Sequence, residues 1–298
     1  MADRGRGIGV ALGIARTGRR GIASGLALAS VFGLAADAAH AGGRLLATDG
    51  ATQLEGAAGG GLVPWAVIAG TGTRDEIGGS AFATGVFVDD LRLVSVGGAI
   101  GLFDRVELSF AHQALEVRPL DEDLRQNVFG LKVRVAGDLV YGRLPALAVG
   151  VQLKHLLDFE LPRAVGADTD LGVDVYAAAS RLFLGALGGH NLLLSGAIRA
   201  TRANEIGLLG FGAPGRDNYQ FRFEGSAAVF LTRRIALGYD FRQKGRGLRF
   251  ADEDPWHAAY LAIVPSHHFK LVAAYARLGQ VAGLGHQDGA YLSVQGSF

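Results

Sequence analysis

Apolar residues occupy every second position over repeated stretches of the chain from about residue 80 onwards. In the stretch 129–138, Phe129, Leu131 and Val133 form one set, and the residues between them are mostly polar or charged. A period of two is the side-chain period of a β-strand with one apolar and one polar face. The pattern recurs at 105–114, 147–154, 170–180, 191–201, 219–231, 234–242 and 268–276. The sequence therefore predicts an all-β protein built from successive strands.

The last twelve residues, QDGAYLSVQGSF, carry the same alternation to the very end of the chain. In a soluble protein, a strand that ends on an exposed phenylalanine would leave an adhesive sheet edge. This ending resembles the closing strand of bacterial outer-membrane β-barrels, whose terminal aromatic residue is read by the insertion machinery. The resemblance implies an insertion signal made of Tyr291, Leu292, Val294 and Phe298.

Three features favour a membrane barrel over a soluble β-sandwich, whose strands also alternate. The apolar sets are nearly free of charge over the nine to eleven residues that a transmembrane strand needs. Six of the seven prolines fall in or beside predicted turns, and aromatic residues lie towards strand ends. We therefore predict an up-and-down antiparallel transmembrane β-barrel of about twelve strands. Fourteen strands also fit, and the count is even if both ends of the barrel lie on one side.

The N-terminus predicts export and divides the chain into three parts. Residues 1–41 contain five arginines, an apolar run at 21–36 and a terminal Ala-His-Ala, which together are typical of a cleaved signal peptide. Residues 42–79 form an N-terminal segment that holds the first strand or strands, or that lies in the lumen. Residues 80–298 form the barrel. We therefore expect an integral protein of a Gram-negative outer membrane.

Connection lengths predict the orientation, because such barrels have short periplasmic turns and longer outer loops. Tight turns are predicted near 103–104, 232–233 and 265–266. Longer connections are predicted near 115–125, 157–169, 203–217, 243–254 and 279–287, with a short outer turn at 89–90 as an exception. This alternation predicts a periplasmic C-terminus.

Composition narrows the function. Without residues 1–41 the chain keeps 24 basic and 26 acidic residues, a net charge of about −2, which gives no electrostatic reason to expect nucleic-acid binding. The sequence has no cysteine, which excludes disulfides, thiolate metal sites and covalent haem attachment. We predict no cofactor. The expected partners are outer-membrane lipids, the barrel-insertion machinery and periplasmic chaperones, and the oligomeric state stays open.

Two motifs suggest chemistry that their context does not support. The glycine-rich run at 56–61 lacks the Gly-Lys-Ser/Thr ending of a phosphate loop, so a tightly packed strand near the barrel seam is preferred. His267 and His268 would point to opposite faces of a strand, so we predict a turn rather than a metal site. No spacing identifies a catalytic nucleophile, and we do not predict an enzyme; a lipid-modifying enzyme is a distant alternative.

The polar sets of the strands face the lumen and are rich in charge. The predicted lumen-lining residues are Arg105, Glu107, Lys132, Arg134, Lys154, Asp174, Arg199, Arg222, Glu224, Asp240, Arg242 and Lys270. With Asp138 included, the inward set has eight bases and five acids. The leading hypothesis is a passive pore for small hydrophilic solutes with a weak anion preference. The alternative is a non-conducting structural or interaction barrel, whose lumen is closed by these charges or by residues 42–79.

Residues 42–83, together with GLFDRVELSFA at 101–111 and FGLKVRV at 129–135, resemble a proteobacterial family described as domain of unknown function 3034. The similarity spans the whole mature chain. It implies an outer-membrane protein and brings no reaction, substrate or catalytic residue.

Overall fold

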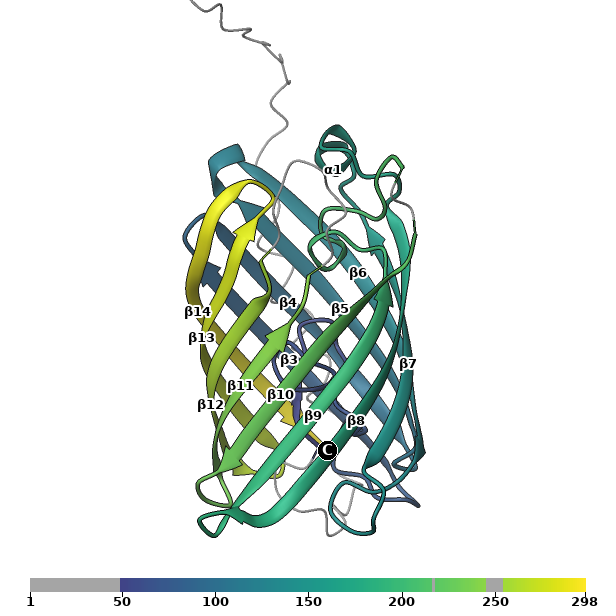
Figure 1. The fold of residues 1–298 in the computed structure, drawn as a ribbon, viewed down its shortest axis with the longest axis vertical. Coiled ribbons are helices and arrows are strands. Elements are labelled where there is room, and N and C mark those ends of the chain that lie inside the picture. The colour runs from purple at the N-terminus through teal and green to yellow at the C-terminus, as the bar shows by residue number, and fades with distance from the viewer. Residues whose placement is uncertain (1–48, 216–217, 245–253) are drawn as a thin grey trace, which may run out of the picture. The chain divides into compact units, whose positions relative to one another are not determined.

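A computed structural model describes residues 49–215, 218–244 and 254–298, and shows one closed barrel of twelve antiparallel strands (Figure 1). The predicted signal peptide lies outside the described residues. Each barrel strand pairs with the next along the chain, and the last strand pairs with the first to close the ring. The strands are β3 (Ile77–Val88), β4 (Leu91–Leu102), β5 (Val106–Val117), β6 (Glu122–Ala136), β7 (Ala146–Leu156), β8 (Leu171–Leu187), β9 (His190–Thr201), β10 (Gln220–Phe230), β11 (Ile235–Arg242), β12 (Trp256–Ser266), β13 (Phe269–Val281) and β14 (Leu284–Ser297). The predicted fold and the preferred strand count are confirmed.

The predicted alternation sorts side chains between the outside and the inside of this barrel. On β6, Leu131 is 41% exposed on the outer surface, whereas the neighbouring Lys132 is 1% exposed inside. On β14, Leu292 and Val294 are exposed and Ser293 between them is buried. The result is an apolar outer belt around a polar interior, which is the arrangement that a bilayer stabilises. No helix among the described residues is long and apolar enough to span a bilayer.

An acidic residue on the outer belt is expected to destabilise the barrel. Leu131→Asp should lower the free energy of unfolding by about 1–3 kcal/mol, because a carboxylate would face hydrocarbon. Leu144→Asp is the matched control, since Leu144 is 50% exposed in the connection between β6 and β7. Denaturant unfolding in lipid vesicles measures both variants. Equal losses for the two would contradict the assignment of the outer face.

The barrel has two mouths, which we name by the chain end. At the C-terminal mouth, where β3 begins and β14 ends, lie the connections 103–105, 137–145, 188–189, 231–234 and 267–268. At the opposite mouth lie 89–90, 118–121, 157–170 with the helix α1 (Glu160–Ala164), 282–283 and the described parts of 202–219 and 243–255.

For two of the long outer connections, the length predicted from the sequence is wrong. Near 115–125 only the short 3-10 turn Arg118–Leu120 and one further residue separate β5 from β6, and near 279–287 two residues separate β13 from β14. Strand pairing continues here beyond the apolar belt, with charged residues facing outward. Arg92 and Glu116 are cross-strand partners with an N–O distance of 3.5 Å, and Arg277 lies opposite Asp288. Charge at these positions marks the edge of the belt and not the end of a strand.

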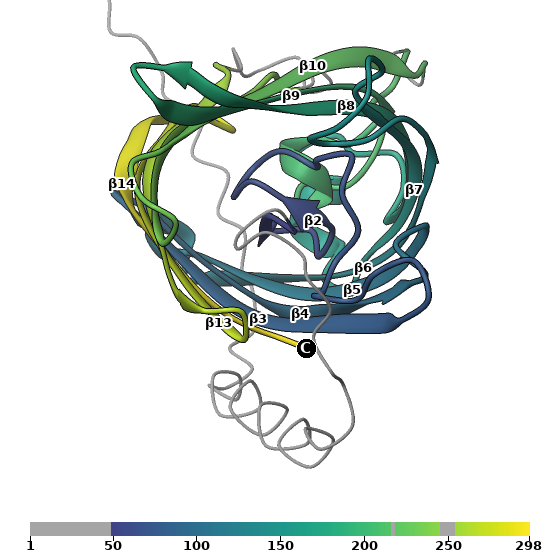
Figure 2. The same ribbon diagram turned by 90° about the horizontal axis from the view of Figure 1, so that it is seen from below.

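Residues 49–71, which we call the plug, lie inside the ring of strands (Figure 2). All of them are buried except the half-buried Ala51. The plug contains two short strands, β1 (Ala51–Thr52) and β2 (Ala58–Gly59), which pair with each other and with no barrel strand. Of the arrangements considered for residues 42–79, residues 49–71 therefore lie in the lumen, whereas 77–79 already belong to β3, so the barrel begins at Ile77 and not at residue 80.

The connection between β9 and β10 also folds inwards, from the opposite mouth. Residues 203–213 of this inward loop (residues 202–215) are buried and include a 3-10 turn at Glu205–Gly207. The backbone carbonyl of Ile206 accepts hydrogen bonds from Lys154 Nζ at 3.1 Å and from Gln126 Nε2 at 3.4 Å. Plug and inward loop thus meet the same ring of wall side chains from opposite mouths.

Candidate functional site

The structure gathers nine of the twelve predicted lumen-lining residues on the buried inner wall. They are Glu107, Lys132, Lys154, Asp174, Arg199, Glu224, Asp240, Arg242 and Lys270, each at most 4% exposed. Arg134 and Arg222 are half-buried nearer the two mouths, and Arg134 forms an ion pair with Asp104. Arg105 does not line the lumen, because the tight turn ends one residue later than expected and leaves its side chain exposed.

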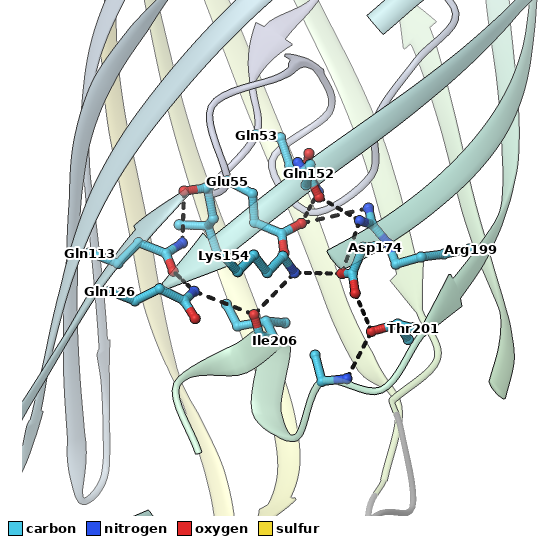
Figure 3. A network of polar contacts seen from close by, with 12 residues as sticks. Gln53, Glu55, Gln113, Gln126, Gln152, Lys154, Asp174, Arg199, Thr201 and Ile206 are labelled. Carbon is cyan, nitrogen blue, oxygen red and sulfur yellow. Dashed lines mark hydrogen bonds and ion pairs between the residues drawn. The ribbon is translucent and has the colours of Figure 1, made fainter. Parts of the chain in front are cut away.

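The plug residue Glu55 lies at the centre of the wall charges (Figure 3). One carboxylate oxygen lies 2.8 Å from Arg242 Nη1 and 3.6 Å from Arg199 Nη2, and the other oxygen forms an ion pair with Lys154. All four side chains are at most 5% exposed. A carboxylate in so little water is stable only when opposite charge surrounds it.

The charges of this central cluster balance only when the plug is present. The wall supplies two carboxylates, Asp174 and Glu224, which pair with Lys154, Arg199 and Arg242. Three cations and two carboxylates leave one positive charge. Glu55 neutralises it, so the plug completes an ion cluster that the wall leaves unbalanced.

The surroundings of Glu55 also set its pKa. Burial alone would raise the pKa of this carboxyl, but the positive charges of Arg242, Lys154 and Arg199 outweigh burial and hold the pKa well below its usual value. A group whose pKa is lower in the docked state stabilises that state above its ordinary pKa. This contribution is lost as the pH falls through the lowered value.

We therefore expect acid to loosen the plug. The contribution of Glu55 to docking should be constant between pH 7 and about 5 and should weaken below about pH 4, where an unperturbed glutamate takes up a proton. Hydrogen exchange of plug amides, corrected for the intrinsic pH dependence of exchange, measures the effect. The neutral variant Glu55→Gln should give a flatter pH profile. Equal profiles for the two proteins would show that Glu55 does not set the acid response.

A second pair of wall residues holds the plug through its backbone. Glu107 and Lys132 form an ion pair at 3.0 Å, and both are 1% exposed. Glu107 accepts hydrogen bonds from the N–H groups of Ala58 at 3.1 Å and Ala69 at 2.8 Å. Lys132 donates to the carbonyls of Ala58 at 3.0 Å and Trp65 at 3.3 Å. Backbone groups buried away from water need such partners, and the wall supplies them.

Both ends of the plug lie at the C-terminal mouth. At its start, Lys270 forms an ion pair with Asp49 and donates to the carbonyl of Gly50 at 2.7 Å. At its end, the N–H of Thr71 donates to the carbonyl oxygen of Phe298 at 3.1 Å. Within the described residues, the first and last residues of the plug, Asp49 and Thr71, therefore both lie at this mouth.

The glycine run at 56–61 packs the plug against the wall. A Cβ atom added at Gly60 would lie 2.5 Å from a carboxylate oxygen of Asp240, and one at Gly61 would lie 3.0 Å from the ring of Tyr291. Asp240 also accepts a hydrogen bond from the N–H of Leu62 at 2.9 Å. These glycines let the plug backbone reach the wall, and they do not form a phosphate loop.

The residues of the predicted insertion signal lie on two faces of the end of the chain. Leu292, Val294 and Phe298 are 53%, 38% and 39% exposed on the outside. Tyr291 is 1% exposed and faces the plug. Phe298 also pairs with Gly79, donating its N–H at 2.9 Å and accepting the N–H of Gly79 at 2.8 Å, and so fixes the seam between β14 and β3.

Loss of the terminal aromatic ring is expected to impair membrane insertion. Deletion of Phe298, or Phe298→Asp, should lower the amount of folded protein in the outer membrane without lowering synthesis. Phe298→Trp is the control that keeps an aromatic ring. Membrane fractionation and heat-modifiable gel mobility measure the outcome. Undiminished levels of the aspartate variant would contradict an insertion signal at this position.

The described part of the chain holds no group of three or more His, Cys, Asp or Glu side chains placed to hold a metal ion. His267 and His268 form the turn between β12 and β13, as predicted. His268 Nδ1 lies 3.0 Å from the carbonyl oxygen of Ser297, which indicates a structural role at the seam.

Sequence reasoning missed the plug residues that complete the site. Glu55 lies outside every alternating stretch, as do Asp49 and Gln53, which is fully buried and donates to Glu55 at 2.8 Å. The feature of the sequence that could have indicated these plug residues was the charge balance of the lumen. Eight bases against five acids in a closed lumen require further negative charge, and the plug supplies some of it through Glu55 and Asp49.

The closed barrel, its apolar belt and its charged interior define an outer-membrane β-barrel protein. The chain belongs to the family "Protein of unknown function (DUF3034)", whose model matches residues 48–295. No curated protein matches the sequence.

Several solved outer-membrane barrels are similar to the chain. A KdgM porin has 11% identity and a TM-score of 0.49, covering 74% of this chain and 99% of its own. A NanC porin has 9% identity and a TM-score of 0.48 with the same coverage. The outer membrane protein Omp33 of Acinetobacter baumannii has 9% identity and a TM-score of 0.43, covering 76% of this chain and 100% of its own. Similarity at this level identifies no solute.

Proposed function

We propose that the protein is a gated outer-membrane conduit, whose lumen is closed at rest by its own plug. The observation that carries the proposal is the position of Glu55, a plug carboxylate that balances three buried wall cations. When the plug is withdrawn, the wall cluster carries one unbalanced positive charge. Water and dissolved ions that enter the lumen then compensate this charge in place of Glu55. The C-terminal mouth is the periplasmic one in this proposal.

Topology supports withdrawal of the plug. The twelve strands close by pairing with one another, and the plug strands pair with none of them. Because both plug ends lie at one mouth, the plug can leave without breaking a barrel hydrogen-bond ladder. This proposal differs from a permanently open pore, because in the described residues the plug and the inward loop occupy the lumen.

A second candidate is the non-conducting structural or interaction barrel with a salt-bridged lumen. The extent of apolar contact favours it, since Leu54, Leu62 and Trp65 of the plug are at most 4% exposed within the main hydrophobic cluster. Such packing is typical of a permanent core. The two candidates differ in one measurable respect, namely whether the lumen conducts once the plug is loosened.

A reversible lock tests the proposal, because the chain has no cysteine of its own. The N–H of Ala66 in the plug donates to Ser180 Oγ on β8 at 2.8 Å, so Ala66→Cys with Ser180→Cys places two thiols at the contact between plug and wall. The control is Ser180→Cys with Ser195→Cys, which joins two wall positions whose hydroxyl oxygens are 2.7 Å apart.

Single-channel recording at low pH compares the two double variants. The plug–wall lock should abolish conductance and a reducing agent should restore it, whereas the wall–wall bond should leave conductance unchanged. Absence of conductance in the reduced and in the wall–wall proteins would overturn the conduit in favour of the non-conducting barrel.

A further inference from the structure

The plug and the inward loop share one buried ammonium group, that of Lys154 on β7 (Figure 3). An ammonium has three N–H donors and no acceptor. Its nitrogen forms an ion pair with Glu55 of the plug, lies 2.6 Å from a carboxylate oxygen of Asp174 on β8, and donates to the carbonyl of Ile206 in the inward loop at 3.1 Å. The side chain is fully buried. Plug, wall and inward loop therefore each supply one of its three acceptors.

A second chain of hydrogen bonds joins the same two segments. Gln113 on β5 donates to the carbonyl of Leu54 in the plug at 2.8 Å. Gln126 on β6 donates to Oε1 of Gln113 at 2.8 Å and to the carbonyl of Ile206 at 3.4 Å. Both glutamines are fully buried. The plug thus orients one amide, and that amide orients the next, which holds the inward loop. We call Lys154, Gln113 and Gln126 the relay.

The relay ends at a strained point of the backbone. Ile206 has a φ of 58°, and Glu205 before it has a φ of 42°. A β-branched residue rarely adopts this left-handed region, because its Cβ lies too close to the backbone. Such a conformation persists only where surrounding contacts hold it. Both branches of the relay end on the carbonyl of Ile206, so they help to hold the strained turn.

One alternative is that the relay only satisfies polar groups buried away from water. The inward loop also has anchors that do not involve the plug. Glu205 forms an ion pair with Lys244 at 2.9 Å, and Leu208 is 2% exposed within the main hydrophobic cluster. If these anchors were sufficient, plug and inward loop would open independently. The relay argues against independence, because loss of the plug removes an acceptor from Lys154 and from Gln113 together.

We propose that the plug and the inward loop are coupled through the relay, so that release of either segment loosens the other. Such coupling is reciprocal, because each segment changes the docking equilibrium of the other by the same factor. The coupling does not depend on the gate. Only its consequence, that the conduit opens at both mouths together, rests on the proposed function.

Hydrogen exchange in the two segments tests the coupling in both directions. Glu55→Lys changes only the plug, and it should accelerate exchange of amides 207–210, whose N–H groups bond within the inward loop, at least about fivefold. Leu208→Asp changes only the inward loop, where it places a charge at a buried apolar position. It should accelerate exchange of plug amides, such as those of Gln53 and Gly60, at least about fivefold.

Two positions outside the lumen provide matched controls. Glu116→Lys makes the same change of charge on the outer surface of β5, and Leu144→Asp makes it in the connection 137–145, where Leu144 is 50% exposed. Neither variant should alter exchange in the plug or in the inward loop. If Glu55→Lys and Leu208→Asp each accelerate exchange only in their own segment, the two segments open independently and the coupling is overturned.

A variant without the relay separates it from general loosening of the lumen. Lys154→Met with Asp174→Asn removes one cation and one carboxylate together, so the central cluster stays balanced. Gln126→Leu removes the other side-chain donor to the inward loop. In this background Leu208→Asp should still open the inward loop but should no longer accelerate exchange in the plug. Undiminished transmission would show that packing joins the segments, and it would overturn the relay. The reciprocal test above does not depend on this variant.

Conductance distinguishes the coupling from the gate. Accelerated exchange in both segments without conductance in any variant would overturn the conduit and leave the coupling standing. Conductance of Glu55→Lys with unchanged exchange in the inward loop would overturn the coupling and leave the gate standing.

Discussion

Replacing Glu55 by lysine is expected to release the plug and to turn a silent barrel into a conducting one. The variant would place a fourth cation among Lys154, Arg199 and Arg242, with only Asp174 and Glu224 left to balance them. Breaking a buried ion pair by removing one partner costs about 3–5 kcal/mol. At about 1.4 kcal/mol per factor of ten, docking should weaken at least a hundredfold.

Two measurements follow the release. Hydrogen exchange of plug amides should accelerate in Glu55→Lys, and planar bilayers should show stable conductance steps. Heat-modifiable gel mobility should remain that of a folded barrel, because the twelve-strand ring closes without the plug.

Glu116→Lys is the matched control for this change of charge. Glu116 lies on the outer surface of β5, with its side chain 36% exposed and 3.5 Å from Arg92, so its pairing contributes little. It should leave exchange and conductance as in the unmodified protein. If Glu55→Lys keeps full protection of the plug and no conductance, the plug is a permanent core and the gate does not exist.

The barrel could be predicted from the sequence because a strand that spans a membrane must alternate apolar residues facing lipid with polar residues facing the lumen. Leu131 faces lipid and Lys132 faces the lumen, and one residue of register shift would exchange them. The alternation of apolar and polar residues continues along each strand for as long as lipid lies on one side of it. Beyond the lipid the alternation no longer marks where the strand ends, and the connections near Arg118 and Ala282 were therefore predicted too long.

A luminal position for residues 42–79 was one of the alternatives that the sequence left open, but the contacts of the plug escaped prediction for a related physical reason. Its side chains meet wall residues on every side, so no period of two or of 3.6 marks them. Glu55 and Gln53 gain their roles only from residues far along the chain, such as Lys154 and Arg242. The wall charges were visible from alternation, but their counter-charge depends on a packing arrangement that local pattern does not encode.

Removing the central arginine of the wall is expected to be the most damaging single change to the barrel itself. Arg199 on β9 is 1% exposed, and its guanidinium lies over the ring of Tyr176 at 5.1 Å. It donates to Glu224 at 2.5 Å and to Gln152 at 2.5 Å, and it lies 3.4 Å from Asp174. One fork-shaped cation therefore holds acceptors from three other strands.

Arg199→Met keeps an unbranched apolar stem but removes the guanidinium, and so leaves two wall carboxylates and Glu55 with less compensation. The free energy of unfolding should fall by about 3–5 kcal/mol, because uncompensated buried charge is left behind. Adding Glu224→Gln should recover part of this loss by removing one of those charges.

Arg277→Met is the control, since Arg277 is 58% exposed in a loose ion pair with Asp288 at 3.9 Å, and it should change stability by at most about 1 kcal/mol. Denaturant unfolding in lipid vesicles measures the free energy of unfolding of the unmodified protein, of Arg199→Met, of Arg199→Met with Glu224→Gln, and of Arg277→Met. If Arg199→Met is no less stable than Arg277→Met, or if Glu224→Gln deepens the loss, the ion cluster does not stabilise the barrel in the way its geometry indicates.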